Sequence, residues 1–286
     1  MVLPMTIALA VVTVVGVAVL VWDQRRTPLP SDAARVANRH AAIAAAVAWA
    51  CVIGGLVASV GIVLMSNADL TGRVMALMPA DAAAVLLTVH AAGELTWPRP
   101  RGTVREARLA PRDTDDVAPR WLHRVTWVWA SALVASLVVF GVVADGPRSV
   151  AVTTPSGLEY SAAPFPGWWY GVPLIAAVLA IIVGVELVLR LVTLRPAVAG
   201  VPASWDLALR RRSARRVLRG AQLPIALTAA GVFWLASITR ANATSDVCLV
   251  LAWVFGVGGC LVAVAPGRDF RAARHEAAAA GAAVAA

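Results

Sequence analysis

The sequence has 286 residues, of which 60% are hydrophobic and 14% are charged, and its mean hydropathy is +0.77. A soluble domain is only about 45–50% apolar, so this composition excludes an ordinary water-soluble protein and indicates a chain that has lipid as its solvent. The formal net charge is +9, and all 25 basic residues are arginine. A chain without lysine forms neither a retinal Schiff base nor a Walker A loop, which excludes rhodopsins and P-loop ATPases.

Seven apolar stretches are long enough to cross about 30 Å of hydrocarbon as helices, which rise about 1.5 Å per residue. Lipid offers the backbone no hydrogen bonds, so each stretch is expected to be helical. The first stretch is followed, not preceded, by charges and lacks a small-residue cleavage site, which predicts an uncleaved helix and not a signal peptide. The predicted spans are about 1–22, 41–65, 78–97, 125–144, 171–194, 222–239 and 247–265, within one integral membrane domain (1–286) that ends in an Ala-rich tail, 266–286.

The arginines between the predicted spans give the orientation. If the first helix enters the membrane from outside, only Arg73, Arg148 and Arg240 of the 25 arginines fall on the outer side. The bias alternates from one connection to the next, as the positive-inside rule requires. A missed or additional span would reverse every later connection. The predicted fold class is therefore an all-α polytopic transmembrane bundle of seven helices, with its N-terminus outside and its C-terminus in the cytoplasm.

Two connections have features of their own. In the outer connection 145–170, the segments 149–153 and 158–161 flank Pro155-Ser156-Gly157, which predicts a hairpin. The aromatic segment 164–170 that follows is expected to be an interfacial anchor or, alternatively, a lid over an outward cavity. On the inner side, Ser204 is predicted to cap a separate short helix. That helix would carry arginines that contact anionic lipid headgroups or, alternatively, an acidic cytoplasmic protein, but no nucleic acid: Arg210, Arg211, Arg212, Arg215, Arg216 and Arg219.

Ionisable side chains within a span are costly, so each one requires an explanation. His90 and Glu94 are four residues apart in the third span, which places them on one face of a helix. Glu186, in the fifth span, is expected at a similar depth in the inner third of the membrane. If the third and fifth helices are neighbours, these three side chains would line one pocket. We therefore predict a proton or cation site formed by His90, Glu94 and Glu186.

A purely structural interpretation of the same residues stays open. Glu186 and Arg190 have the i, i+4 spacing and the order of charges that favour an ion pair on a helix. Glu94 would then reach toward Arg99, and His90 would be a neutral hydrogen-bonding group between helices.

The sequence contains no catalytic, cofactor or metal signature. His90 is the only histidine within a predicted span, which is too few for a bis-histidine haem or a zinc site, and no G-x-S-x-G motif is present. Cys51, Cys248 and Cys260 form no C-x-x-C pair and are expected to be packing residues. We therefore expect a small permease or transport component with a buried ion site and no enzymatic activity, or alternatively a non-catalytic subunit or sensor that recruits a cytoplasmic partner. The expected location is the cell (inner or plasma) membrane of a bacterium, because the arginine-only composition is typical of a GC-rich genome.

Overall fold

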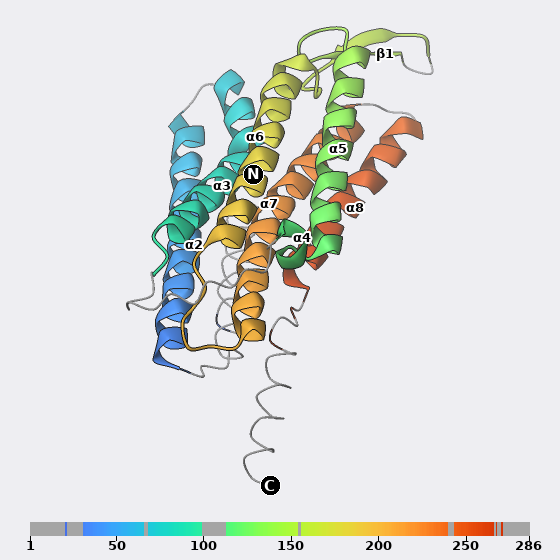
Figure 1. Cartoon of the computed structure of the whole chain (residues 1–286). Coiled ribbons are helices and arrows are strands. Elements are labelled where there is room, and N and C mark those ends of the chain that lie inside the picture. The colour runs from blue at the N-terminus through green and yellow to red at the C-terminus, as the bar shows by residue number, and fades with distance from the viewer. Residues whose placement is uncertain are drawn as a thin grey trace.

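The structure is a computed structural model, and it describes residues 21, 31–65, 68–98, 113–153, 156–239, 243–265, 267 and 270. These residues form a bundle of long helices with a two-stranded hairpin at one end (Figure 1). The helices are α2 (Asp32–Met65), α3 (Ala68–Leu95), α4 (Thr114–Val117), α5 (Arg120–Val143), α6 (Trp168–Leu194), α7 (Ala203–Thr239) and α8 (Ala243–Val264). The strands are β1 (Val150–Thr153) and β2 (Glu159–Ala162).

Within the described residues, six helices are long and apolar enough to cross a membrane: α2, α3, α5, α6, α7 and α8. This result confirms the prediction of a helical, multi-pass membrane protein. The predicted first span, 1–22, lies outside the described residues except for Val21, and the tail does so except for Gly267 and Phe270. The count of seven spans and the orientation of the two termini therefore stay predictions.

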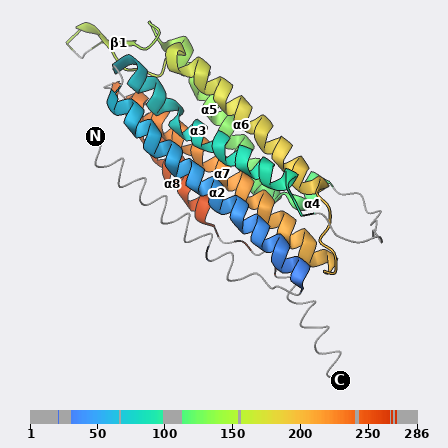
Figure 2. The same ribbon diagram turned by 90° about the vertical axis from the view of Figure 1, so that its left-hand side faces the viewer.

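Helix α7 is the centre of the bundle. Four other helices, α3, α5, α6 and α8, pack directly on it, and α2 packs on α3 at one side (Figures 1 and 2). The largest hydrophobic cluster joins α3, α5, α6 and α7 through side chains such as Leu133, Leu174 and Ile225. Small residues bring the helices close together: a Cβ added at Gly259 of α8 would come within 2.6 Å of the Ala226 Cβ of α7. Such contacts hold helices together in lipid, where apolar surface alone gives them no reason to associate.

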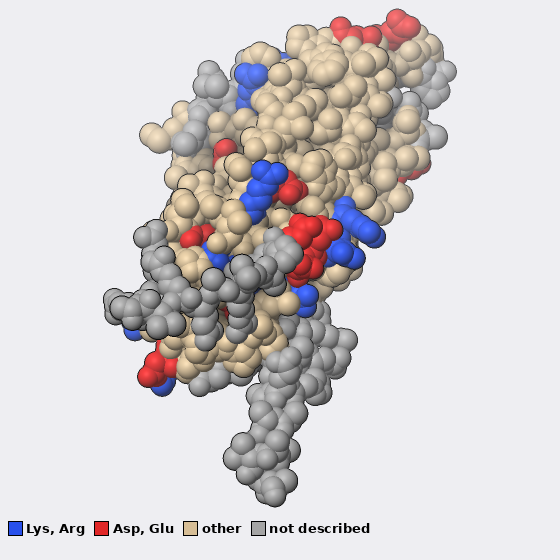
Figure 3. Space-filling view, viewed as in Figure 1, with Lys and Arg blue, Asp and Glu red and all other residues tan. Residues whose placement is uncertain are grey.

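The two ends of the bundle differ in chemistry. We call the end that holds residues 144–170 the hairpin end. We call the opposite end, which holds residues 32–41, 94–97 and 190–216, the arginine end. Successive long helices run in opposite directions between the two ends, so the arginines of α7 and Arg195, which follows α6, lie at the same end. On the face shown in Figure 3, most charged side chains gather in the half of the molecule at the arginine end.

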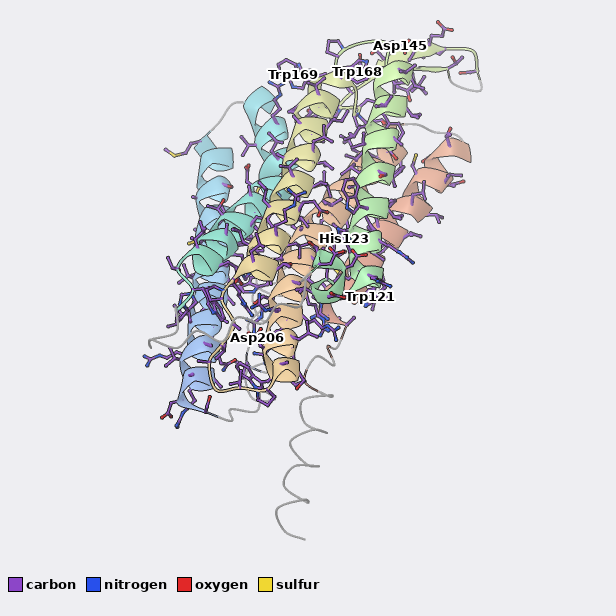
Figure 4. The ribbon with its side chains drawn as sticks, viewed as in Figure 1. Trp121, His123, Asp145, Trp168, Trp169 and Asp206 are labelled. Carbon is purple, nitrogen blue, oxygen red and sulfur yellow. The ribbon has the colours of Figure 1, made fainter. Side chains whose placement is uncertain are left out.

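The predicted hairpin is confirmed at the hairpin end. Strands β1 and β2 pair antiparallel, with Val152 opposite Tyr160, and Gly157 in the turn has a φ of +80°, which favours glycine. The fully buried Phe165 packs edge-on against Phe140 of α5, with ring centroids 5.6 Å apart. Trp168 and Trp169 follow at the first turn of α6, near the hairpin (Figure 4). The connection therefore contacts the ends of the helices through Val150, Val152 and Phe165, whereas residues 156–161 are exposed.

The prediction that a helix begins near Ser204 is confirmed, but the prediction that this helix is short and separate is wrong. Helix α7 begins at Ala203 and continues without a break into the predicted sixth span as far as Thr239. Its first half is rich in Ala, Leu and Arg, which favour helix, and no proline interrupts it before Pro224. Other helices also begin earlier than the predicted spans, such as α2 at Asp32 and not at residue 41. Hydropathy locates the part of a helix that lipid surrounds, whereas packing against neighbours keeps the polar turns beyond it helical.

Candidate functional site

The corner between α6 and α7 is organised by Arg210. This arginine is only 1% exposed, and its guanidinium donates hydrogen bonds to the carbonyl oxygens of Val192, Thr193 and Arg195 at distances of 2.7–2.9 Å. Those carbonyls lie at the end of α6, where a helix leaves them without partners of its own and where a positive charge is favourable. Nε of Arg210 also donates to Asp206 at 2.9 Å, one turn earlier on α7. The Arg210 side chain therefore fixes the start of α7 against the end of α6.

The residue that Arg210 holds, Arg195, is the centre of a buried polar cluster. Nη1 of Arg195 donates to both carboxylate oxygens of Glu94, at 3.3 and 3.2 Å, and to Oγ of Ser213 at 3.3 Å. Its guanidinium carbon lies 3.9 Å from the centre of the Trp97 ring, a cation–π contact. The side chains of Arg195 and Glu94 are 0% and 7% exposed. The buried ion pair thus joins the end of α6 to α3, and α7 contributes Ser213 beside it.

Two histidines complete the cluster on the side of α2 and α3. Nε2 of His40, on α2, donates to the carbonyl of Gly93 at 2.8 Å, and the His40 ring contacts Trp97 edge-on. His90 is buried one turn before Glu94. A small cavity of about 10 Å³ lies between these side chains and is also lined by Arg216 and Ser213. That volume holds roughly one water molecule, and the lining offers several polar partners for it.

The hydrogen-bonding capacity of the Arg195 guanidinium is only partly used. Nε and Nη2 of Arg195 are buried and have no hydrogen-bond acceptor. Burial lowers the pKa of the Arg195 guanidinium, and the negative charge of Glu94 opposes this effect. A buried N–H group without a partner is costly, which makes these two atoms candidates for binding an anion or an ordered water.

Glu186 lies in a different place. Its Oε1 accepts hydrogen bonds from Nε2 of His123 at 2.7 Å and from Nε1 of Trp127 at 3.1 Å, both on α5. The His123 and Glu186 side chains are 26% and 31% exposed, so this contact is less protected than the one between Arg195 and Glu94. Figure 4 shows His123 on α5, well away from Asp206 at the start of α7.

The structure thus brings together two of the three predicted site residues. His90 and Glu94 share one cavity, as their spacing predicts, but Glu186 faces α5 and is separated from them. Among the ion pairs of the described residues, Glu186 pairs with His123 and not with Arg190, because α5 presents two donors to it. Arg99, the alternative partner predicted for Glu94, lies outside the described residues. Within the described residues, Glu94 forms its ion pair with Arg195.

Several members of the cluster were not predicted from the sequence. His40, Arg195 and Ser213 lie outside the predicted spans, so they were not considered for a buried site. The sequence does contain an indication of the contact between Glu186 and α5. His123 and Trp127 are four residues apart, so that both face one side of α5 and can donate to the same acceptor.

The predicted arginine cluster does not form one exposed surface. Arg210 and Arg212 are 1% and 3% exposed, so neither is free to contact lipid headgroups. Nη1 of Arg212 donates to Oδ1 of Asn38 and Nη1 of Arg216 to the carbonyl of Ala41, which ties α7 to α2. Arg211 is exposed, and Arg215, Arg216 and Arg219 are half-buried. These arginines are buried because α7 is central, so that most of its faces meet other helices.

The described residues contain no group of three or more His, Cys, Asp and Glu side chains that could hold a metal ion. The class of protein that the fold and this cluster define is a multi-pass membrane protein with a buried, arginine-centred polar site. The chain matches no protein-family model, no curated protein sequence and no solved structure.

Proposed function

We propose that this protein is a small permease or transport component of the cell membrane, and that its ion site is the cluster around Arg195. The observation that carries the proposal is the pair of buried N–H donors of Arg195, Nε and Nη2, that lack an acceptor. The same cluster contains a water-sized cavity, which is lined by Glu94 and Ser213, the two hydrogen-bond partners of the Arg195 guanidinium, and by His90. Donors of this kind favour a small inorganic anion over the proton or cation expected from the sequence.

Glu94 gives the site a means of release. Its carboxylate is the anion that Arg195 already binds, through two oxygens at 3.2 and 3.3 Å. An incoming anion of one or a few atoms would displace this carboxylate from the guanidinium, and the return of Glu94 would expel the anion. Glu94 therefore acts as an internal competitor, whereas Ser213 and Trp97 hold the guanidinium in position.

Movement across the membrane requires the helices to bend, because the core between this cluster and the hairpin end is packed with leucine, valine and isoleucine. Helices α3 and α7, which carry Glu94 and Ser213, each contain an interior proline, Pro79 and Pro224. A proline removes one backbone hydrogen bond of its helix and provides a point for bending.

The test is chloride flux into liposomes that contain the purified protein and a chloride-quenched dye. The wild-type protein is expected to carry chloride faster than empty liposomes. Arg195→Gln is expected to reduce the flux to the empty-liposome level, and Glu94→Gln to increase it severalfold, because a neutral amide competes less well for Arg195. The matched control is Arg190→Gln, an exposed arginine on α6 outside the cluster, which should leave the flux unchanged.

Wild-type flux equal to that of empty liposomes, or equal flux in Arg195→Gln and wild type, would overturn the proposal. Arg195→Lys, which keeps the charge, serves as a second variant if the glutamine variant does not fold. The alternative of a membrane subunit that recruits an acidic cytoplasmic partner would then rest on Arg211, the exposed member of the predicted cluster.

A further inference from the structure

One side of α7 is left open by the described helices. A groove of about 630 Å³ runs along α7 and α8 and is lined almost entirely by apolar side chains. Trp234 of α7 is 51% exposed there, and Trp253 and Leu261 of α8 are 63% and 64% exposed. The other sides of α7 are covered by α3, α5, α6 and α8. A further helix in the groove would complete the ring of helices around α7.

We propose that the N-terminal apolar segment, residues 1–22, occupies this groove as an additional membrane helix. The segment lies outside the described residues apart from Val21, and its 22 residues correspond to about 33 Å of helix, enough to cross the hydrocarbon. The segment contains no charged residue and is mostly apolar, which matches the lining of the groove.

The position of α2 brings the segment within reach of the groove. Nine residues, 23–31, connect residue 22 to Asp32 at the start of α2, and they span at most about 30 Å when extended. The start of α2 is near the end of α8, because Phe270 packs in the same buried cluster as Ala34 and Ala37. The groove reaches Val264, the last residue of α8. The connection is therefore long enough to place residue 22 beside this end of the groove.

The groove is also shaped for a close helix contact. A Cβ added at Gly231 of α7 would meet no atom within 4 Å, and one added at Gly256 of α8 would meet only the Ala230 Cβ, at 3.6 Å. Small residues on the floor of a groove allow the backbone of a neighbouring helix to approach closely. Gly54 and Gly55 of α2 are equally open, but Gly231 and Gly256 lie in a groove between two helices.

Cross-linking to Cys260 tests the proposal directly. Cys260 is exposed and lines the groove, Cys51 is exposed on α2, and residues 1–22 contain no cysteine. Single cysteines are introduced at positions 12–20 in a background that keeps only Cys260, by Cys51→Ala and Cys248→Ala. A matched background keeps only Cys51. In native membranes treated with a short thiol cross-linker, we expect intramolecular cross-links to Cys260 at positions three or four apart, and at least fivefold weaker cross-links to Cys51.

A second set of variants tests whether the cross-link depends on the groove being open. Gly231→Trp is expected to abolish the cross-link to Cys260 while the protein still purifies as a folded species, because a Cβ there meets no atom within 4 Å and the indole would extend into the groove. Gly55→Trp on α2, where a Cβ also meets nothing within 4 Å, is the control and should leave the cross-link unchanged. No cross-link to Cys260 at any position, stronger cross-links to Cys51, or a dimer joined through two copies of Cys260 would overturn the proposal.

Discussion

The last two helices of the chain show that hydrophobicity does not predict burial in this protein. Helix α8 is the more apolar of the two, yet only 17% of its membrane window is buried, compared with 56% of the window of α7. In water the more apolar helix would be the more deeply buried. In lipid an apolar helix is well solvated at the surface, whereas arginines, glutamine and serine need protein partners. The polar residues of α7 therefore place it at the centre.

This contrast predicts that the largest loss of stability follows from removing a buried cation of α7. Arg210→Leu leaves Asp206 buried without its partner and three carbonyls at the end of α6 without a donor. We expect a loss of about 5 kcal/mol, at the upper end of the range for breaking a buried pair. The measurement is the free energy of unfolding in detergent micelles. Arg211→Leu, at an exposed position on the same helix, is the control and should lose less than about 1 kcal/mol. Equal losses in the two variants would contradict the capping role.

The ion pair between Glu94 and Arg195 is expected to show strong coupling. Glu94→Leu leaves the Arg195 guanidinium buried without a counter-charge, at an expected cost of about 3 kcal/mol. The double variant Glu94→Leu/Arg195→Met replaces both charges by apolar groups of similar size and is expected to be more stable than either single variant. A double-mutant cycle of unfolding free energies measures this. Additive losses would mean that the two groups do not stabilise each other.

The contact of α7 with α8 is expected to tolerate less added volume than exposed surface does. Gly259→Leu would place a side chain where a Cβ already comes within 2.6 Å of the Ala226 Cβ, with an expected loss of about 2 kcal/mol. Gly55→Leu, where a Cβ meets nothing within 4 Å, should be neutral or slightly stabilising, because leucine favours helix over glycine. Unfolding free energies of the two variants make the comparison, and a neutral Gly259→Leu would show that α8 moves away without cost.

The sequence predicts the parts of the fold that depend on local patterns. Apolar stretches and the order of arginines locate α5, α6 and α8 within a few residues, and the Pro-Ser-Gly turn locates β1 and β2. The Ser204 signal locates the beginning of α7 to within one residue. Its continuation into the sixth span was not predictable from hydropathy, because contacts with α2 and α6 hold the polar first half in the same helix.

The partners of the charged residues depend on packing, which is why only part of the site was predictable. Arg195 is 101 residues from Glu94, and nothing in the spacing favours it over the neighbouring Arg99. Helix α6 is apolar on all sides, so its pattern does not show whether Glu186 faces α3 or α5. His90 and Glu94 were predictable as a pair, because four-residue spacing holds on any helix.

The smallest expected effect is that of changing Glu186. Its comparison with Glu94 tests whether a less buried carboxylate contributes less to stability. Glu186→Gln and Glu94→Gln are the same chemical change, but the side chains are 31% and 7% exposed. A glutamine at position 186 keeps an oxygen that can accept the hydrogen bonds from His123 and Trp127, so the change should cost only about 0.5 kcal/mol. Glu94→Gln should cost several times more, because the charge of Arg195 stays buried. Glu186→Gln should also leave chloride flux unchanged. A change in flux equal to that of Glu94→Gln would place both carboxylates in one functional unit despite their separation, as the sequence had predicted.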